Sequence, residues 1–85
     1  MREFKFVITD PEGMHIRPAG IFVKKAEGFK SNVTIERGHR EADAKRIMRV
    51  MALGIGCGEE ITVRCEGSDE NEAIAELEKF FKENM

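Results

Sequence analysis

The spacing of apolar residues in this chain changes repeatedly between a two-residue period and a helical period. The two-residue period covers residues 4–9, 32–36 and 61–66, which predicts three strands with one apolar face each. Helical spacing predicts one helix between His15 and Gly28, one over residues 44–53, and one after Asp69. A charged segment, residues 40–43, follows the turn Arg37-Gly38-His39-Arg40 and is expected to be a short strand at a sheet edge.

The expected order is strand, helix, strand, strand, helix, strand, helix. Strands with a single apolar face need only one covering layer, and three helices can supply it. We therefore expect an α+β fold, an open-faced β-sandwich with a four-stranded, mainly antiparallel sheet. The 85 residues form one domain, residues 1–85, with a modest core.

Local sequence also predicts how the helices begin and end. Gly28 is expected to end the first helix in a left-handed conformation, with Phe29 folding back onto it. Gly54 is expected to end the second helix. Asp69, followed three residues later by Glu72, has the spacing of a capping box at the start of the last helix.

Composition excludes several classes of protein. The net charge of −2 gives no argument for nucleic acid binding, and no apolar stretch approaches the roughly 20 residues needed for membrane insertion. We expect a cytoplasmic monomer without a cofactor. Cys57 and Cys65 lack the C-x-x-C spacing of metal or redox motifs, so Cys65 is expected in the core and Cys57 as a loop thiol. No pair among His15, His39 and the cysteines has a chelating spacing, so no metal site is expected.

The segment Gly13-Met14-His15-Ile16-Arg17-Pro18-Ala19 places a histidine at the start of a predicted helix. The first N–H groups of a helix lack partners and attract phosphate. A neutral imidazole is a nucleophile near pH 7. From these residues alone, two interpretations of His15 stay open: a helix N-cap, or a nucleophile that forms a phosphohistidine.

Arg17 lies on the unfavourable side of the helix dipole, and a phosphate partner would explain its presence there. Pro18 and Gly13 have an architectural interpretation. Proline is acceptable in the first turn, where no N–H bond is lost. Gly13 is expected to let the chain approach His15 closely.

Three motifs resemble those of the HPr family, the histidine-containing phosphocarriers of the bacterial phosphoenolpyruvate-dependent sugar phosphotransferase system. They are Gly13 to Ala19, Lys45-Arg46-Ile47-Met48-Arg49-Val50-Met51-Ala52-Leu53-Gly54, and Glu66-Gly67-Ser68-Asp69-Glu70. The resemblance covers the whole chain and implies the open-faced sandwich. It also implies that His15 accepts a phosphoryl group on Nδ1 from enzyme I and gives it to a sugar-specific enzyme IIA. Arg17 would assist the transfer, and Ile16 and Pro18 would support the phosphate. Such a protein is a carrier rather than an enzyme.

The second motif implies a docking surface beside His15. A small domain cannot easily bury every apolar residue of a short helix, and exposed methionines form adaptable binding surfaces. Val50 and Leu53 are expected in the core. The resemblance assigns docking to Ile47, Met48 and Met51. Positive charge around these three residues could steer acidic partners, which include possible regulatory proteins. The charge comes from Lys24, Lys45, Arg46 and Arg49.

Two positions depart from the family pattern. Arg46 stands where many members have a regulatory serine, and without a hydroxyl it cannot be made a phosphoserine. Glu12 stands where a small polar residue is frequent. Because a carboxylate would repel a phosphohistidine, Glu12 is expected to point away from the site.

Three alternatives remain beside the sugar phosphocarrier. One is a family paralogue that serves a nitrogen-related or dihydroxyacetone-kinase relay. Another is a regulatory binding module, against which the presence of His15 argues. The third is a small RNA-binding α+β domain, which would need aromatic residues on an exposed sheet face in a basic field. Here the phenylalanines fall on core-facing positions, and His39 is expected to be a solvated turn residue.

Overall fold

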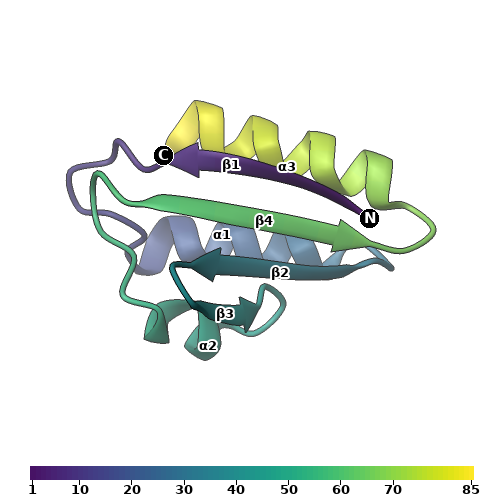
Figure 1. Ribbon diagram of the computed structural model, residues 1–85, viewed down its shortest axis with the longest axis horizontal. Helices are drawn as coiled ribbons and strands as arrows, with labels where there is room; N and C mark the ends of the chain where they lie inside the picture. The colour runs from purple at the N-terminus through teal and green to yellow at the C-terminus, as the bar shows by residue number, and fades with distance from the viewer.

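Four strands and three helices follow one another in the predicted order in the computed structural model, which describes residues 1–85. The strands are β1 (Arg2–Val7), β2 (Asn32–Arg37), β3 (Arg40–Asp43) and β4 (Glu60–Glu66); the helices are α1 (Ile16–Glu27), α2 (Ile47–Ala52) and α3 (Glu70–Asn84). Every strand pair is antiparallel, in the order β1-β4-β2-β3. The helices lie on one side of this sheet (Figure 1). The predicted fold class and the edge position of β3 are confirmed.

The core lies between the sheet and the helices. Its centre is aromatic: the Phe81 ring on α3 packs 5.2 Å from Phe22 on α1 and 5.8 Å from Phe4 on β1. Val50 and Leu53 are buried as predicted. Cys65 is buried as well, whereas Cys57 is an exposed thiol. The fold therefore has one apolar cluster, to which every helix and strand contributes.

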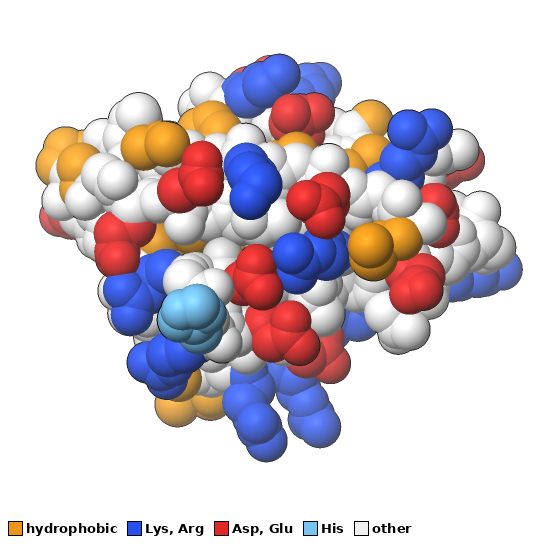
Figure 2. All heavy atoms as spheres, viewed as in Figure 1, with side chains coloured by type: hydrophobic (Ala, Val, Ile, Leu, Met, Phe, Trp, Pro, Cys, Tyr) orange, Lys and Arg blue, Asp and Glu red, His pale blue; other side chains and the backbone are white.

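The uncovered face of the sheet is polar. Figure 2 shows acidic and basic side chains interspersed over it. The Arg64 guanidinium bridges Glu3 and Glu36 at 3.0 and 3.3 Å. Four phenylalanines are buried, and Phe6 and Phe29 pack against the core. The aromatic platform of an RNA-binding sheet is therefore not present. None of the three helices is both long and apolar enough to cross a membrane.

The second helix is shorter than the sequence predicts. The spacing indicated residues 44–53, but α2 begins at Ile47. The Asp43 carboxylate accepts a hydrogen bond from the Lys45 N–H, and its carbonyl accepts one from the Arg46 N–H. This turn occupies the segment that helical spacing alone would have assigned to the helix. Gly54 has a φ of +62° and ends the segment as expected.

The first helix ends at Gly28 and the last begins after Asp69, as predicted, but the predicted capping of both ends is wrong. Gly28 has φ −73° and ψ −10°, a right-handed conformation, because its N–H bonds to carbonyls of the preceding turn. Asp69 makes no cap bond to its own helix. Its carboxylate instead accepts hydrogen bonds from the N–H groups of Lys30 and Ser31 and from the Ser31 hydroxyl. The Glu70 carboxylate accepts from the Gly67 N–H in place of the expected capping box.

Candidate functional site

The loop before α1 is fixed by main-chain contacts. The Gly13 N–H donates to the Asp10 carbonyl at 2.9 Å, which closes a turn over residues 10–13, and the Met14 N–H donates to the Ile55 carbonyl at 3.0 Å. Gly13 has a φ of +68°, and a Cβ there would lie 2.5 Å from the Ile55 oxygen and 2.8 Å from Gly56 Cα. The close approach that Gly13 permits is thus to the loop after α2, rather than to His15 as expected.

The last residue of the chain also holds this loop. The main-chain oxygen of Met85 accepts hydrogen bonds from the Asp10 N–H at 2.8 Å, from the Thr9 N–H and from the Thr9 hydroxyl. The Met85 side chain is buried. Sequence reasoning missed this residue, although its spacing of four from Phe81 continues the apolar stripe of α3.

His15 immediately precedes α1 and has the extended conformation of an N-cap residue, with φ −82° and ψ 179°. Its carbonyl accepts the first helical bond, from the Ala19 N–H at 3.0 Å. His15 is thus the N-cap residue of α1 by its backbone, but its side chain makes no cap bond. The N–H groups of Ile16 and Arg17 take part in no backbone hydrogen bond. A one-third exposed imidazole therefore adjoins two free donors at the positive end of a helix.

Two carboxylates face the His15 ring. Asp10 Oδ2 lies 3.4 Å from His15 Nε2, and Glu12 Oε2 lies 3.5 Å from the same nitrogen. The expectation that Glu12 points away is therefore wrong. The turn is the reason: Asp10 Oδ1 accepts the Glu12 N–H at 2.9 Å, which brings both acids to the ring. Sequence reasoning did not single out Asp10, although acids at the first and third turn positions could have indicated it.

The other residues of the motif lie where the sequence places them along α1. Arg17 is exposed and has no ion-pair partner or side-chain hydrogen bond in the structure, so its guanidinium is free to meet an anion. Pro18 is buried in the first turn, and Ile16 is 62% exposed.

Helix α2 packs against α1 and carries the predicted docking residues. Met48 is 76% exposed, the largest exposure among the bulky apolar residues. Ile47 and Met51 are half-buried against the core. Lys24, Arg46 and Arg49 are exposed. The short helix thus cannot bury all its apolar residues, as the sequence indicated.

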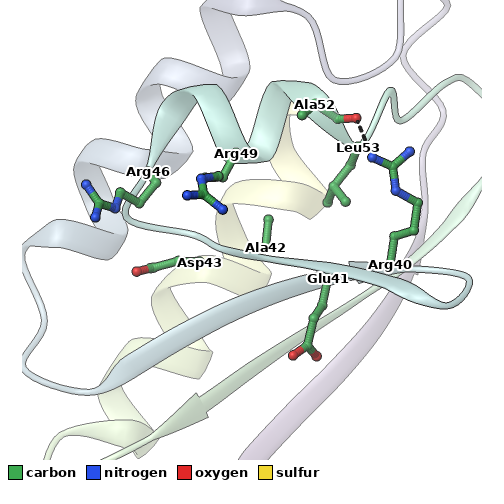
Figure 3. Close-up of a pocket in the computed structure, with 8 residues that line it drawn as sticks. All are labelled: Arg40, Glu41, Ala42, Asp43, Arg46, Arg49, Ala52 and Leu53. Carbon is green, nitrogen blue, oxygen red and sulfur yellow. Dashed lines mark hydrogen bonds between the residues drawn. The ribbon is translucent and has the colours of Figure 1, made fainter.

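A hollow of about 430 Å³ lies between β3 and α2. Arg40, Arg46 and Arg49 contribute to its lining over the apolar floor of Ala42 and Leu53. Figure 3 shows Arg40 donating to the Ala52 carbonyl, at 3.2 Å, while Glu41 points to the opposite side of the strand. Arg40 was not among the predicted residues; it extends the positive surface of α2 onto the sheet edge. No group of three histidine, cysteine or acidic residues is placed to hold a metal ion.

Comparison with known proteins finds matches over almost the whole chain. The family model described as the PTS HPr component phosphorylation site matches residues 2–83. The phosphocarrier protein HPr of Mycoplasma capricolum is 40% identical over 79 residues, which is 93% of this chain and 89% of that protein. The solved structure of a mycoplasma histidine-containing phosphocarrier has a TM-score of 0.94 at 38% identity and covers 96% of this chain and 93% of its own.

Two further solved structures share the fold at 34–36% identity. HPr from Thermoanaerobacter tengcongensis has a TM-score of 0.92 at 36% identity, covering 96% of this chain and 92% of its own. The domain-swapped dimer of Crh, a catabolite repression protein of Bacillus subtilis, has a TM-score of 0.78 at 34% identity, covering 100% and 98%. The family match, the identity and the shared fold agree, and the chain therefore belongs to the HPr family of phosphocarrier proteins.

Proposed function

We propose that this protein accepts a phosphoryl group from enzyme I on Nδ1 of His15 and passes it to an enzyme IIA of the sugar phosphotransferase system, in the cytoplasm. One observation carries the proposal. A partly exposed imidazole, free of any capping bond, stands beside two unpaired N–H groups and an arginine without a counter-ion.

The chemistry follows from these groups. The lone pair of Nδ1 attacks phosphorus in line, the N–P bond forms, and the bond between phosphorus and the donor breaks with its electron pair. The free N–H groups of Ile16 and Arg17 can donate to the phosphoryl oxygens, and the helix dipole favours their negative charge. The Arg17 guanidinium adds a charge-assisted donor, while Pro18 fixes the turn that presents these groups.

Docking is assigned to the apolar residues around Met48, which include Ile47 and Met51. Met48 gives the patch an exposed, adaptable centre. Lys24, Arg49 and Arg46 surround it with positive charge, which favours acidic partners and speeds their encounter. Since Arg46 has no hydroxyl, regulation by phosphorylation of a serine at this position does not apply to this chain.

The direct test is phosphorylation by enzyme I with phosphoenolpyruvate. Wild-type protein should acquire an acid-labile, base-stable phosphate and donate it to an enzyme IIA. H15A should acquire none, whereas H39A, which changes the exposed histidine of the β2–β3 turn, should behave as wild type. Unlabelled wild-type protein, or label that survives in H15A, would show the proposal to be wrong.

A further inference from the structure

Both carboxylates at the site converge on a single nitrogen of the histidine. Asp10 Oδ2 and Glu12 Oε2 lie 3.4 and 3.5 Å from Nε2, while the side chain makes no bond to the N–H groups of α1. The two ring nitrogens therefore have different surroundings. Nε2 is the nitrogen that contacts both carboxylates, at 3.4 and 3.5 Å.

The Asp10 carboxylate is held in place from several directions. Its Oδ1 accepts the Glu12 N–H, its own N–H donates to the Met85 oxygen, and its carbonyl accepts the Gly13 N–H. These bonds leave Oδ2 as the oxygen that faces the ring. The Asp10 side chain is 23% exposed and that of Glu12 is 74% exposed, so Asp10 forms an inner contact and Glu12 an outer one.

We propose that Asp10 and Glu12 are positioning residues that hold the ring proton of His15 on Nε2, so that Nδ1 keeps its lone pair for the phosphoryl group. The proposal rests on the proposed function for its consequence, although the proton position itself does not. A neutral imidazole carries its proton on one nitrogen, and the charged and polar groups that face the two nitrogens select which one. An ionised carboxylate can only accept, so it stabilises an N–H at the nitrogen it faces.

The same contact serves both directions of transfer. When Nδ1 bonds to phosphorus, the proton stays on Nε2 and the ring becomes a cation, which the two carboxylates stabilise. When the phosphoryl group leaves, the electron pair of the N–P bond returns to Nδ1. The ring is then neutral again, with the same proton on Nε2. No proton has to move in either step, as suits a carrier that must both accept and donate.

The proton position can be read from ¹⁵N spectra of the imidazole rings in unphosphorylated protein, at about pH 9, well above the pKa of a free imidazole. His39 is exposed in a turn and provides the reference ring in the same spectrum. We expect His15 to have a larger fraction of the Nε2–H form than His39. E12Q should lower that fraction, and E72Q, which removes an exposed acid at the start of α3, should not.

D10N gives the sharpest expectation. The amide oxygen of the new side chain can still accept the Glu12 N–H, while its NH₂ group occupies the position of Oδ2 and donates to Nε2. The His15 proton should then shift towards Nδ1, so that the Nε2–H fraction falls below that of His39. Equal fractions for the two rings in wild-type protein would overturn the proposal. An unchanged fraction in both D10N and E12Q would also overturn it. Because Glu12 is mostly exposed, E12Q tests the point even where D10N fails to fold.

Transfer from phosphorylated enzyme I to His15 should be about two- to fivefold slower in E12Q, because the ring cation that develops as the N–P bond forms has lost one exposed charge contact. E72Q should accept phosphate at the wild-type rate. The two proposals fail separately. Label that survives in H15A would contradict the proposed function and leave the proton position standing. His15-dependent label with no difference between the two rings would contradict the positioning role alone.

Discussion

The two ends of the sheet are held together in different ways. At one end, called here the site end, residues 8–15 meet residues 54–58 and Met85. At the other, the far end, residues 28–31 meet residues 67–70. The chain terminates at the site end and begins at the far end (Figure 1).

Main-chain groups do most of the holding at the site end. Met14 donates to Ile55, Gly58 donates to Ile8 at 2.8 Å, and Asp10 donates to the Met85 oxygen. These bonds fix the backbone without using the His15 imidazole or the Arg17 guanidinium. The groups needed for phosphoryl chemistry thus remain free.

One carboxylate does the corresponding work at the far end. Asp69 accepts from Lys30 N at 2.8 Å, from Ser31 N at 2.9 Å and from the Ser31 hydroxyl. These bonds, with the hydroxyl contributing most, lower the pKa of Asp69 to about 2. At this end the polar side chains make the hydrogen bonds that hold the loops together. The difference teaches that, in this small domain, side chains remain free for function where main-chain groups hydrogen-bond to one another.

The largest effect is expected when alanine replaces the glycine that lies closest to a neighbouring loop at each end, which is Gly13 at the site end and Gly67 at the far end. G13A should lower the free energy of unfolding by about 2–4 kcal/mol, because its Cβ would meet the Ile55 oxygen at 2.5 Å and φ is +68°. Urea unfolding measures the loss. G54A is the matched control: its φ is +62° but no atom lies within 4 Å, so only backbone strain of about 1–2 kcal/mol is expected.

G67A makes the equivalent change at the far end, where a Cβ would lie 2.7 Å from Ser31 Cα. It should destabilise the protein to a similar extent. Per folded molecule, G67A should accept phosphate from enzyme I at the wild-type rate, whereas G13A should be slower. Equal slowing by both variants would mean that the two ends do not divide function from structure.

The second test is the acid stability of the far end. The pKa of Asp69 is lower when folded than its ordinary value of 3.8, so its ionised form stabilises the fold above that value. This contribution is lost as the pH falls from 3.8 through about 2. D69N should therefore have a lower urea midpoint than wild type near neutral pH, and the gap should narrow between pH 3.8 and about 2. A gap independent of pH would contradict the role assigned to the charge.

A smaller effect, on transfer alone, is expected at Met48, on the helix that leads into the site end. M48E places a charge on a side chain that is 76% exposed, so the urea midpoint should not change. Phosphoryl transfer from enzyme I should fall about tenfold, as for a docking residue worth about 1.4 kcal/mol. I21E is the control, since Ile21 is 50% exposed in a hollow beside α3. Equal loss in both variants would remove Met48 from the docking surface.

Much of this fold could be predicted from local patterns. The alternation around Val33 and Ile61 and the helical spacing of Phe22 and Leu77 report which face meets the core, and one core requires one arrangement of layers. The identity of the site depended on the resemblance, since the residues around His15 alone left the N-cap interpretation open. The docking residues stay predictions, supported by the exposure of Met48.

The wrong predictions share a physical origin, which is competition from distant or irregular partners. Asp69 serves Ser31, 38 residues away, because it satisfies three donors there and would satisfy fewer as a cap of its own helix. Met85 reaches Thr9 across 76 residues. Glu12 approaches His15 because the Asp10 turn orients its backbone. The expectation that Glu12 points away considered only repulsion from a phosphoryl group and not this turn. Local rules for caps and turns contain none of these contacts.

The smallest effect is expected from labelling the two cysteines, one at each end. Cys57 is exposed at the site end, with its Sγ 3.8 Å from the Thr9 carbonyl. Burial, with the nearby charges of Asp69 and Glu70, raises the pKa of Cys65 to about 11. A disulfide reagent at neutral pH should therefore modify one thiol in folded protein and two in urea, and Cys57 modification should leave the urea midpoint almost unchanged.

The labelling rate of Cys65 then sharpens the comparison. If the far end is held as firmly as its hydrogen bonds indicate, Cys65 should react only through global unfolding, with the free energy that urea denaturation gives. G67A and D69N should increase the labelling rate of Cys65 by the factor by which they increase the equilibrium constant of unfolding. Cys65 labelling faster than global unfolding allows would show that the far end opens locally, and the side-chain bonds of Asp69 would then be the weaker of the two ways of holding an end.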